Sequence, residues 1–196
     1  MVAAVRETFE EAGILLATTQ TSTYSDPSKL PSLRSSLNAG NLDFAEVVSA
    51  LDGQLALRSL GFLSRWVTPE IERKRFDAFF FLADVTDHPG HATADGTETE
   101  HGRWIAPEMV LAQHEAKQVQ LAPPTLRALE YLAQAPAQSW ASLLRTHSEP
   151  ICPQFVATAA HPTLVLPGDP LHVPPGECEN RFVRATTHWE SIGVGF

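Results

Sequence analysis

The stretch from Arg75 to Ala83 constrains the fold more than any other part of the sequence. It reads Arg-Phe-Asp-Ala-Phe-Phe-Phe-Leu-Ala, so its second half is apolar at consecutive positions. A strand with one face in water alternates apolar and polar residues, whereas a strand covered on both faces is apolar throughout. The run therefore predicts a central strand that is buried on both faces.

Helices are expected on both sides of this strand along the chain. Residues Val2 to Ala12 combine good helix formers with a shared apolar face, and Gly13 stands where a left-handed cap would end the helix. Apolar spacing favours a helical insertion at about residues 28–52. Two further helices are expected at Pro107 to Lys117 and at Pro123 to Ala133.

Short strands are expected elsewhere. Ile14 to Thr18 could begin a strand, and Arg103 to Ile105 follows a polar stretch that reads as a loop. Beyond Ala135 the composition shifts towards Pro and His, and Thr163 to Leu166 and Asn180 to Thr187 suggest two strands around a Pro-rich turn. We treat residues 135–196 as a C-terminal extension, for which a structural hairpin is favoured over a lid or a dimer contact.

Composition limits the classes of partner. The 196 residues carry a formal net charge of -9, whereas nucleic acids and anionic membranes attract basic surfaces. Cys152 and Cys178 are the two cysteines, so a disulfide scaffold or a four-ligand zinc site is not expected. The apolar stretch after Met1 is too short for a signal sequence or a membrane span. A cytoplasmic protein without nucleic-acid or membrane partners is expected.

The helix at residues 2–12 carries the clearest chemistry. Glu7, Glu10 and Glu11 stand at i, i+3 and i+4, so three carboxylates share one helical face. Mg²⁺ prefers such oxygen ligands, together with water and phosphate. The alternative is a solvated acidic face, but Glu7 and Glu11 repel each other and the last turn of a helix disfavours anions. This cost favours a metal site, beside which Arg6 could hold Glu10 in place.

The order of residues in this helix resembles a known signature. Arg6-Glu7-Thr8-Phe9-Glu10-Glu11-Ala12-Gly13-Ile14 matches the second half of the Nudix box, Arg-Glu-U-x-Glu-Glu-x-Gly-U, where U is a bulky apolar residue. The first U is the exception, because Thr8 stands there. Counting back from Arg6, the earlier Gly and Glu of the full signature would fall before Met1. The chain thus resembles an N-terminally truncated member of the Nudix hydrolase superfamily with only half of the box.

This resemblance implies a fold and a reaction. Nudix domains are α/β/α sandwiches with a mixed sheet, so we expect an α/β protein of that type without its first strands, plus a helical insertion and a C-terminal β extension. By the same resemblance, Glu7, Glu10 and Glu11 would bind Mg²⁺ or Mn²⁺. The metal would neutralise a diphosphate and activate a water for attack on phosphorus. Arg6 and the glutamates would be the catalytic residues, with the identity of the general base left open.

Motifs beyond the box extend the resemblance to the coenzyme A diphosphatase (Nudix motif 19) branch, over roughly Val2 to Ala133. These motifs are Arg65-Trp66-Val67-Thr68-Pro69, Arg75-Phe76-Asp77, Trp104 with Pro107-Glu108, and Pro123-Pro124-Thr125-Leu126.

Two pairs of residues outside the box are further candidates. Glu98 and Glu100 precede Trp104 as an additional catalytic acid does in many members, although an ordinary solvated loop is the alternative. Arg65 and Arg75 could contact substrate phosphates, with surface or salt-bridge roles as the alternative.

Two functions stay open. The first is a metal-dependent hydrolase of a diphosphate linkage in a coenzyme A derivative or another nucleoside diphosphate-X compound, with a small-molecule partner and a homodimer as an option. The second is a weak or inactive Nudix fragment or binding module, because half of the box and the strands before it are missing. Loss of those strands would uncover a sheet edge and an apolar face. In both cases the Nudix domain is placed at residues 1–134 and the extension at 135–196.

Overall fold

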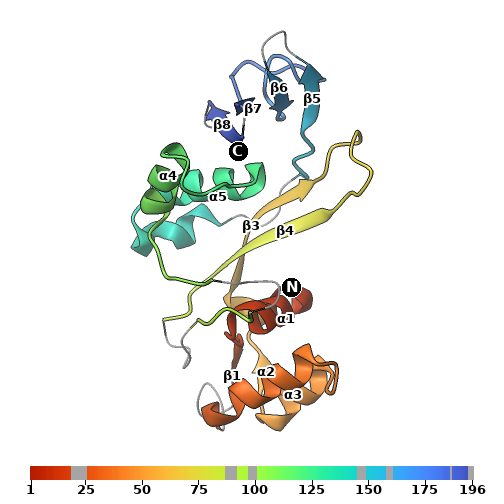
Figure 1. Ribbon diagram of the computed structural model, residues 1–196, viewed down its shortest axis with the longest axis vertical. Coiled ribbons are helices and arrows are strands. Elements are labelled where there is room, and N and C mark those ends of the chain that lie inside the picture. Colours follow the sequence, from red (N-terminus) through yellow and green to blue (C-terminus); the bar gives the residue numbers. More distant parts are fainter. Residues whose placement is uncertain are drawn as a thin grey trace. The chain divides into compact units, whose positions relative to one another are not determined.

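The computed structural model describes residues 1–18, 26–86, 92–96, 101–144, 149–157, 161–185 and 187–193. The chain divides into two compact units. Unit 1 comprises Met1–Gly61 and Phe81–Trp104, and unit 2 comprises Phe62–Phe80 and Ile105–Phe196. Both contain helices and strands (Figure 1). The α/β class expected from the sequence is therefore confirmed.

Unit 1 is mainly helical. Its elements are α1 (Val2–Ala12), β1 (Ala17–Thr18), the 3-10 helix η1 (Pro27–Lys29), α2 (Leu30–Asn38), α3 (Phe44–Ala50), β2 (Gln54–Leu55) and the 3-10 helix η2 (Leu57–Ser59). β1 pairs antiparallel with β2. α2 and α3 occupy the stretch where helices were expected, and α3 begins with a capping box in which Asp43 and Glu46 bond each other's backbone N–H groups.

The core of unit 1 is built from the inner faces of these helices. Val5 and Phe9 of α1 are fully buried, and they pack with the segment Ile14–Ala17 that follows the helix. Further buried core residues come from α2, α3 and the turn after α3: Leu30, Leu37, Val47 and Leu51. α1 is thus anchored by one face, and its other residues are left towards solvent.

Unit 2 combines a hairpin, two helices and a separate sheet. Its elements are most of β3 (Leu60–Val67) and β4 (Asp77–Ala83), α4 (Pro107–Glu115), α5 (Pro123–Ala133), the 3-10 helix η3 (Ala137–Leu143), β5 (Gln154–Ala157), β6 (Pro162–Val165), β7 (Arg181–Ala185) and β8 (His188–Ile192). The helices expected at the Pro107 and Pro123 positions are confirmed. Proline suits the first turn of a helix because its missing N–H would have no partner there.

The last four strands form an antiparallel meander in the order β5-β6-β7-β8 (Figure 1). Phe155 lies opposite Leu164, and Leu164 lies opposite Phe182. The core beneath the sheet contains Trp66, Leu126, Leu166 and Phe182. Thus α5 and β3 are both packed against the meander within unit 2.

The prediction that residues 75–83 form a central strand buried on both faces is wrong. β4 begins at Asp77, its neighbour in the sheet is β3, and every residue of β4 is at least partly exposed. Phe80 packs against the core of unit 2, whereas Phe79 points to the opposite face and is 52% exposed. The second neighbour of β3 is Ile151, which forms a parallel bridge with Trp66. An apolar run shows that a strand can be buried on both faces, but other segments decide whether it is.

Two further strand predictions need correction. Arg103–Ile105 forms no strand with the described residues, and Trp104 is 70% exposed, so a short apolar segment was not enough to specify a strand here. The described part of residues 135–196 has four strands where two were expected, because β5 and β8 gain their order from cross-strand pairing and not from a clear apolar pattern of their own. Within the described part of the chain, no helix is long and apolar enough to cross a membrane.

Candidate active site

The acidic residues of α1 are positioned by the burial of the opposite face of the helix. Val5 and Phe9 are one turn apart and both are 0% exposed. Glu7 and Glu11 follow each of them by two residues, which is about half a helical turn. Glu7 is therefore half-exposed and Glu11 is exposed, on the side of α1 that faces away from the core.

Arg6 links two of the three carboxylates. Its Nη2 donates a hydrogen bond to Oε1 of Glu7, and its Nε lies 3.5 Å from Oε2 of Glu10. The hydrogen bond to Glu7 raises the pKa of Arg6 above its ordinary value, and the charges of Glu10 and Glu7 add to this effect. The pairing of Arg6 with Glu10 that the sequence suggested is present, so one guanidinium orients two acids.

The C-terminal end of α1 is held by residues that the sequence did not point to. The carbonyl of Glu10 accepts hydrogen bonds from Arg34 Nε at 3.0 Å and from Asn38 Nδ2 at 3.2 Å. Arg34 also donates to Oγ1 of Thr93, whose backbone N–H bonds to the carbonyl of Ala12. A cation is favourable at the negative end of the helix dipole, where it offsets the cost of placing acids there.

Arg34 is therefore a positioning residue for the carboxylate helix. Burial lowers its pKa below the ordinary value, and the charge of Asp95 opposes that shift. Its Nη1 lies close to the point where a side chain on Gly13 would begin, at 3.1 Å from an ideal Cβ. Gly13 has φ of 74° and caps α1 through its N–H to the carbonyl of Phe9. The sequence separation of 24 residues between Glu10 and Arg34 hides this contact from any local pattern.

The other predicted site residues have different surroundings. Arg65 forms a bidentate ion pair with Asp77, with bonds of 2.8 and 2.6 Å, and its guanidinium lies 5.1 Å from the centre of the Phe79 ring. The hydrogen bond to Arg65 lowers the pKa of Asp77. Arg75 Nε donates to the carbonyl of Thr68. Both arginines belong to unit 2, and Arg65 has the salt bridge that was the alternative to substrate binding.

The two loop acids, Glu98 and Glu100, lie outside the described residues. Their proposed catalytic role stays a prediction.

Sequence comparison decides the family. The profile of the NUDT19 Nudix domain matches residues 1–132, about two thirds of the chain. The chain belongs to this Nudix family. The resemblance found in the half-box and in the downstream motifs is confirmed, and the family profile spans α1 and most of α5.

Curated relatives agree with this assignment at low identity. "Putative nudix hydrolase 7" of Caenorhabditis elegans is 26% identical over 88% of this chain and 57% of its own length. "Acyl-coenzyme A diphosphatase NUDT19" of Homo sapiens is 28% identical over 88% of this chain and 50% of its own length, and the Xenopus laevis protein of that name is 25% identical over 87% and 50%. The chain thus spans about half the length of the curated relatives it matches.

A solved Nudix structure has a similar fold. The NUDIX hydrolase from Alicyclobacillus acidocaldarius superimposes with a TM-score of 0.63 and 26% sequence identity, over 74% of this chain and 65% of that chain. The α/β architecture with antiparallel sheets therefore matches a Nudix hydrolase fold in three dimensions as well as in sequence.

Nudix enzymes generally use divalent metals, which need oxygen donors from the protein. Glu7, Glu10 and Glu11 offer carboxylate oxygens, the donors that Mg²⁺ and Mn²⁺ favour. Among the residues that the structure describes, no three His, Cys, Asp or Glu side chains are gathered so that they could hold a metal ion. Arg6 currently engages Glu7 and Glu10. The oxygen atoms of these carboxylates are the donor type that suits a hard dication, but their arrangement in the described residues does not bring three of them together.

Proposed function

We propose that this chain carries the metal-binding helix of a Mg²⁺- or Mn²⁺-dependent hydrolase, which cleaves a diphosphate linkage in a coenzyme A derivative or another nucleoside diphosphate-X compound. The observation that carries the proposal is the acidic face of α1, with Val5 and Phe9 fixed in the core and Glu7 and Glu11 directed outwards. The family match and the name of the NUDT19 relatives support the class of reaction.

Each charged residue of the helix has a role in this proposal. Glu7, Glu10 and Glu11 supply oxygen ligands, and Arg6 orients Glu7 and Glu10 through the contacts described above. A bound dication would neutralise charge on the diphosphate and lower the pKa of a bound water. One of the glutamates accepts the proton of the attacking water as a general base. Arg34 holds the end of the helix, so it acts through Glu10 and not on the substrate.

Arg65, Arg75, Glu98 and Glu100 belong to the proposal in a secondary role. An arginine binds phosphate oxygens with a planar pair of donors. Arg75 is exposed and uses its Nε for the carbonyl of Thr68, so its terminal nitrogens are the better candidates for substrate contact. Arg65 would have to leave Asp77 to take this role. Glu98 or Glu100 would supply a further acid.

The substitution Glu11→Gln is the direct test. The purified chain is incubated with coenzyme A, an acyl-coenzyme A and ADP-ribose, with Mg²⁺ or Mn²⁺, and the phosphopantetheine or nucleotide products are quantified. Glu11→Gln keeps the size of the side chain but removes a charged ligand, so turnover should fall by about 100-fold or more. Glu115→Gln, at the exposed end of α4, is the matched control and should keep full activity.

Binding of Mn²⁺ followed by electron paramagnetic resonance gives a second readout. Turnover that is unchanged by Glu11→Gln refutes the site. Mn²⁺ binding that depends on Glu11, without turnover of any substrate, would instead support the alternative of a catalytically inactive Nudix binding module.

A further inference from the structure

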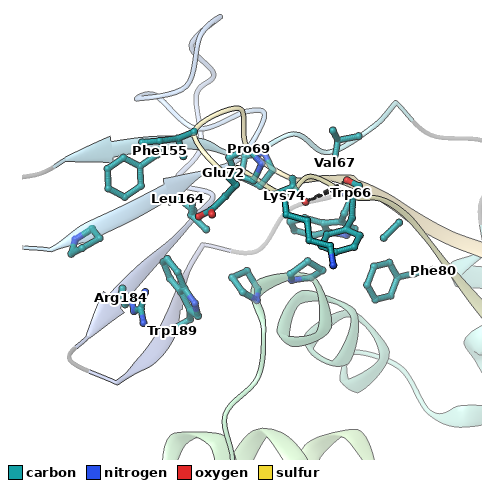
Figure 2. Close-up of a pocket in the computed structure, with 18 residues that line it drawn as sticks. Trp66, Val67, Pro69, Glu72, Lys74, Phe80, Phe155, Leu164, Arg184 and Trp189 are labelled. Carbon is teal, nitrogen blue, oxygen red and sulfur yellow. Dashed lines mark hydrogen bonds between the residues drawn. The ribbon is translucent and has the colours of Figure 1, made fainter. Parts of the chain in front are cut away.

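A pocket of about 510 Å³ lies within unit 2, well apart in sequence from the acidic helix. It is formed by the ends of β3 and β4, the first turn of α5 and the β5–β8 meander (Figure 2). Its volume falls in the range of about 300 to 1,000 Å³ that is typical of small-molecule sites.

The walls of the pocket are rings and hydrocarbon. Trp66, Phe80, Phe155, Leu164 and Trp189 line it, together with several prolines. The indole N–H of Trp66 already donates to Oγ of Ser64 at 3.2 Å. The buried Trp66 ring therefore lines the pocket with carbon atoms, because its one polar group is already hydrogen-bonded within the protein. Such walls favour a ligand that is apolar along most of its length.

Two cations border these walls. Lys74 lies beside Trp66 and Arg184 lies beside Trp189 (Figure 2). The ammonium of Lys74 is 4.9 Å from the centre of the Phe76 ring, and the guanidinium of Arg184 is 5.7 Å from the centre of the Trp189 ring. None of the ion pairs found among the described residues involves either cation.

The balance of charge around the pocket is positive. Glu72 is the one acid among the described residues that line it, against Lys74 and Arg184. Both cations are exposed and rest on aromatic faces, which attract a cation only weakly at such sites. An anionic group can therefore draw them without breaking a strong contact. The positive balance around the pocket contrasts with the net charge of -9 of the whole chain.

We propose that this pocket binds a medium-chain alkyl anion, such as a fatty carboxylate or an alkyl phosphate. The chain lies between the rings of Trp66, Phe80 and Trp189, and the anionic head lies at Lys74 or Arg184. A flexible chain suits apolar walls that present few hydrogen-bonding groups. The inference goes beyond the hydrolase activity, because it uses no residue of the Nudix helix and no metal.

Titration of the purified full chain with decanoate, below its aggregation concentration, tests the proposal. Binding is followed by calorimetry and by the fluorescence of tryptophan, since Trp66 and Trp189 both line the pocket. Decyl phosphate tests the other head group, and decanol and decyltrimethylammonium test the need for negative charge. Decanoate and decyl phosphate should bind saturably with one site, and decyltrimethylammonium should bind at least about tenfold more weakly.

Variants separate the charge from the cavity. The double variant Lys74→Gln/Arg184→Gln should weaken decanoate binding by about tenfold and leave decanol unchanged. Arg73→Gln, an exposed neighbour that does not line the pocket, is the matched control and should bind like the unmodified chain. Ala78→Trp, on β4, should obstruct the cavity and weaken the binding of both ligands.

Circular dichroism and thermal unfolding verify that each variant is folded. Lys74→Gln/Arg184→Gln changes exposed side chains alone, so it still tests the proposal if Ala78→Trp does not fold. Equal binding of decanoate and decyltrimethylammonium, or decanoate binding that survives both the charge variant and a folded Ala78→Trp, overturns the proposal. The Glu11→Gln variant should lose hydrolase activity and still bind decanoate. The proposed hydrolase activity and the proposed alkyl-anion site can therefore be refuted independently.

Discussion

Replacing Asp169 by Asn should cost unit 2 much of its stability. Asp169 lies in the turn between β6 and β7, and its side chain is 0% exposed. Its Oδ1 accepts from the N–H of Leu171 at 2.8 Å, and its Oδ2 accepts from the N–H of Asn180 and from Nε of Arg181, each at 2.8 Å. A single carboxylate thus ties the long β6–β7 connection together.

The magnitude follows from what the substitution leaves behind. An amide at position 169 cannot accept at both of its polar atoms, so at least one buried donor loses its partner, and the guanidinium of Arg181 loses its buried counterion. Breaking a buried pair in this way costs about 3–5 kcal/mol. Glu179→Gln is the matched control, because Glu179 contacts the same Arg181 at 3.4 Å but is 64% exposed. An exposed pair contributes about 0–1 kcal/mol.

Urea unfolding followed through the fluorescence of tryptophan, with Trp189 on β8, measures both variants. The free energy of unfolding should fall by about 3–5 kcal/mol for Asp169→Asn and by less than about 1 kcal/mol for Glu179→Gln. If the two variants lose the same amount, the burial of Asp169 does not matter and the reasoning is refuted.

The pH dependence gives an independent reading of Asp169. Burial alone would raise its pKa, but the hydrogen bonds from Asn180, Leu171 and Arg181 outweigh burial and hold the pKa below its ordinary value. A carboxyl whose pKa is lower in the folded protein stabilises the fold above its unfolded pKa, near about 3.9, and loses that contribution as the pH falls through the folded pKa. The stability difference between the unmodified chain and Asp169→Asn should therefore be full near neutral pH and shrink in acid below about pH 4.

Two predictions concern unit 1. Gly13→Ala should lower the free energy of unfolding by about 1–2 kcal/mol because its φ is 74°, and by roughly 1 kcal/mol more because an ideal Cβ would lie 3.1 Å from Nη1 of Arg34. Gly40→Ala is the control for the backbone cost alone, because Gly40 has φ of 70° and open space around the position of a Cβ. Equal losses of stability in urea unfolding for the two variants would show that the contact with Arg34 is unimportant. Asp43→Ala removes the hydrogen bond that the Asp43 carboxylate accepts from the N–H of Glu46 at the start of α3, and should cost about 0.5–2 kcal/mol, with some loss of helical circular dichroism. Ser49→Ala, on the exposed side of the same helix, should cost far less, and a similar loss there would argue against the cap.

Local sequence patterns predicted the helices and the acidic face well. The periodicity of residues 2–12, the glycine after them and the prolines at 107 and 123 predicted α1, α4 and α5 close to their observed ends. These features depend on contacts three or four residues apart, so they are readable from sequence alone. The spacing of Glu7, Glu10 and Glu11, and the pairing of Arg6 with Glu10, belong to the same class.

Contacts between distant segments had to come from the tertiary structure. Residues 75–83 are apolar enough for a buried strand, yet Phe79 is 52% exposed, and its ring contacts Phe62 and Arg65 of the neighbouring strand β3. The cation that holds the end of α1 is Arg34, and the pocket joins residues from β3 to β8. These side chains are brought together by segments that are tens of residues apart in the sequence, so no local periodicity predicts their contacts.

The amino-acid sequence by itself therefore determined the lineage of this chain and the helix that carries its acids, because a helix repeats its geometry every few residues. The tertiary structure alone decided which faces are covered, how the acidic helix is stabilised at its negative end, and where two cations meet an apolar cavity. Burial and charge compensation are properties of neighbours in space, and those neighbours are far apart along the chain.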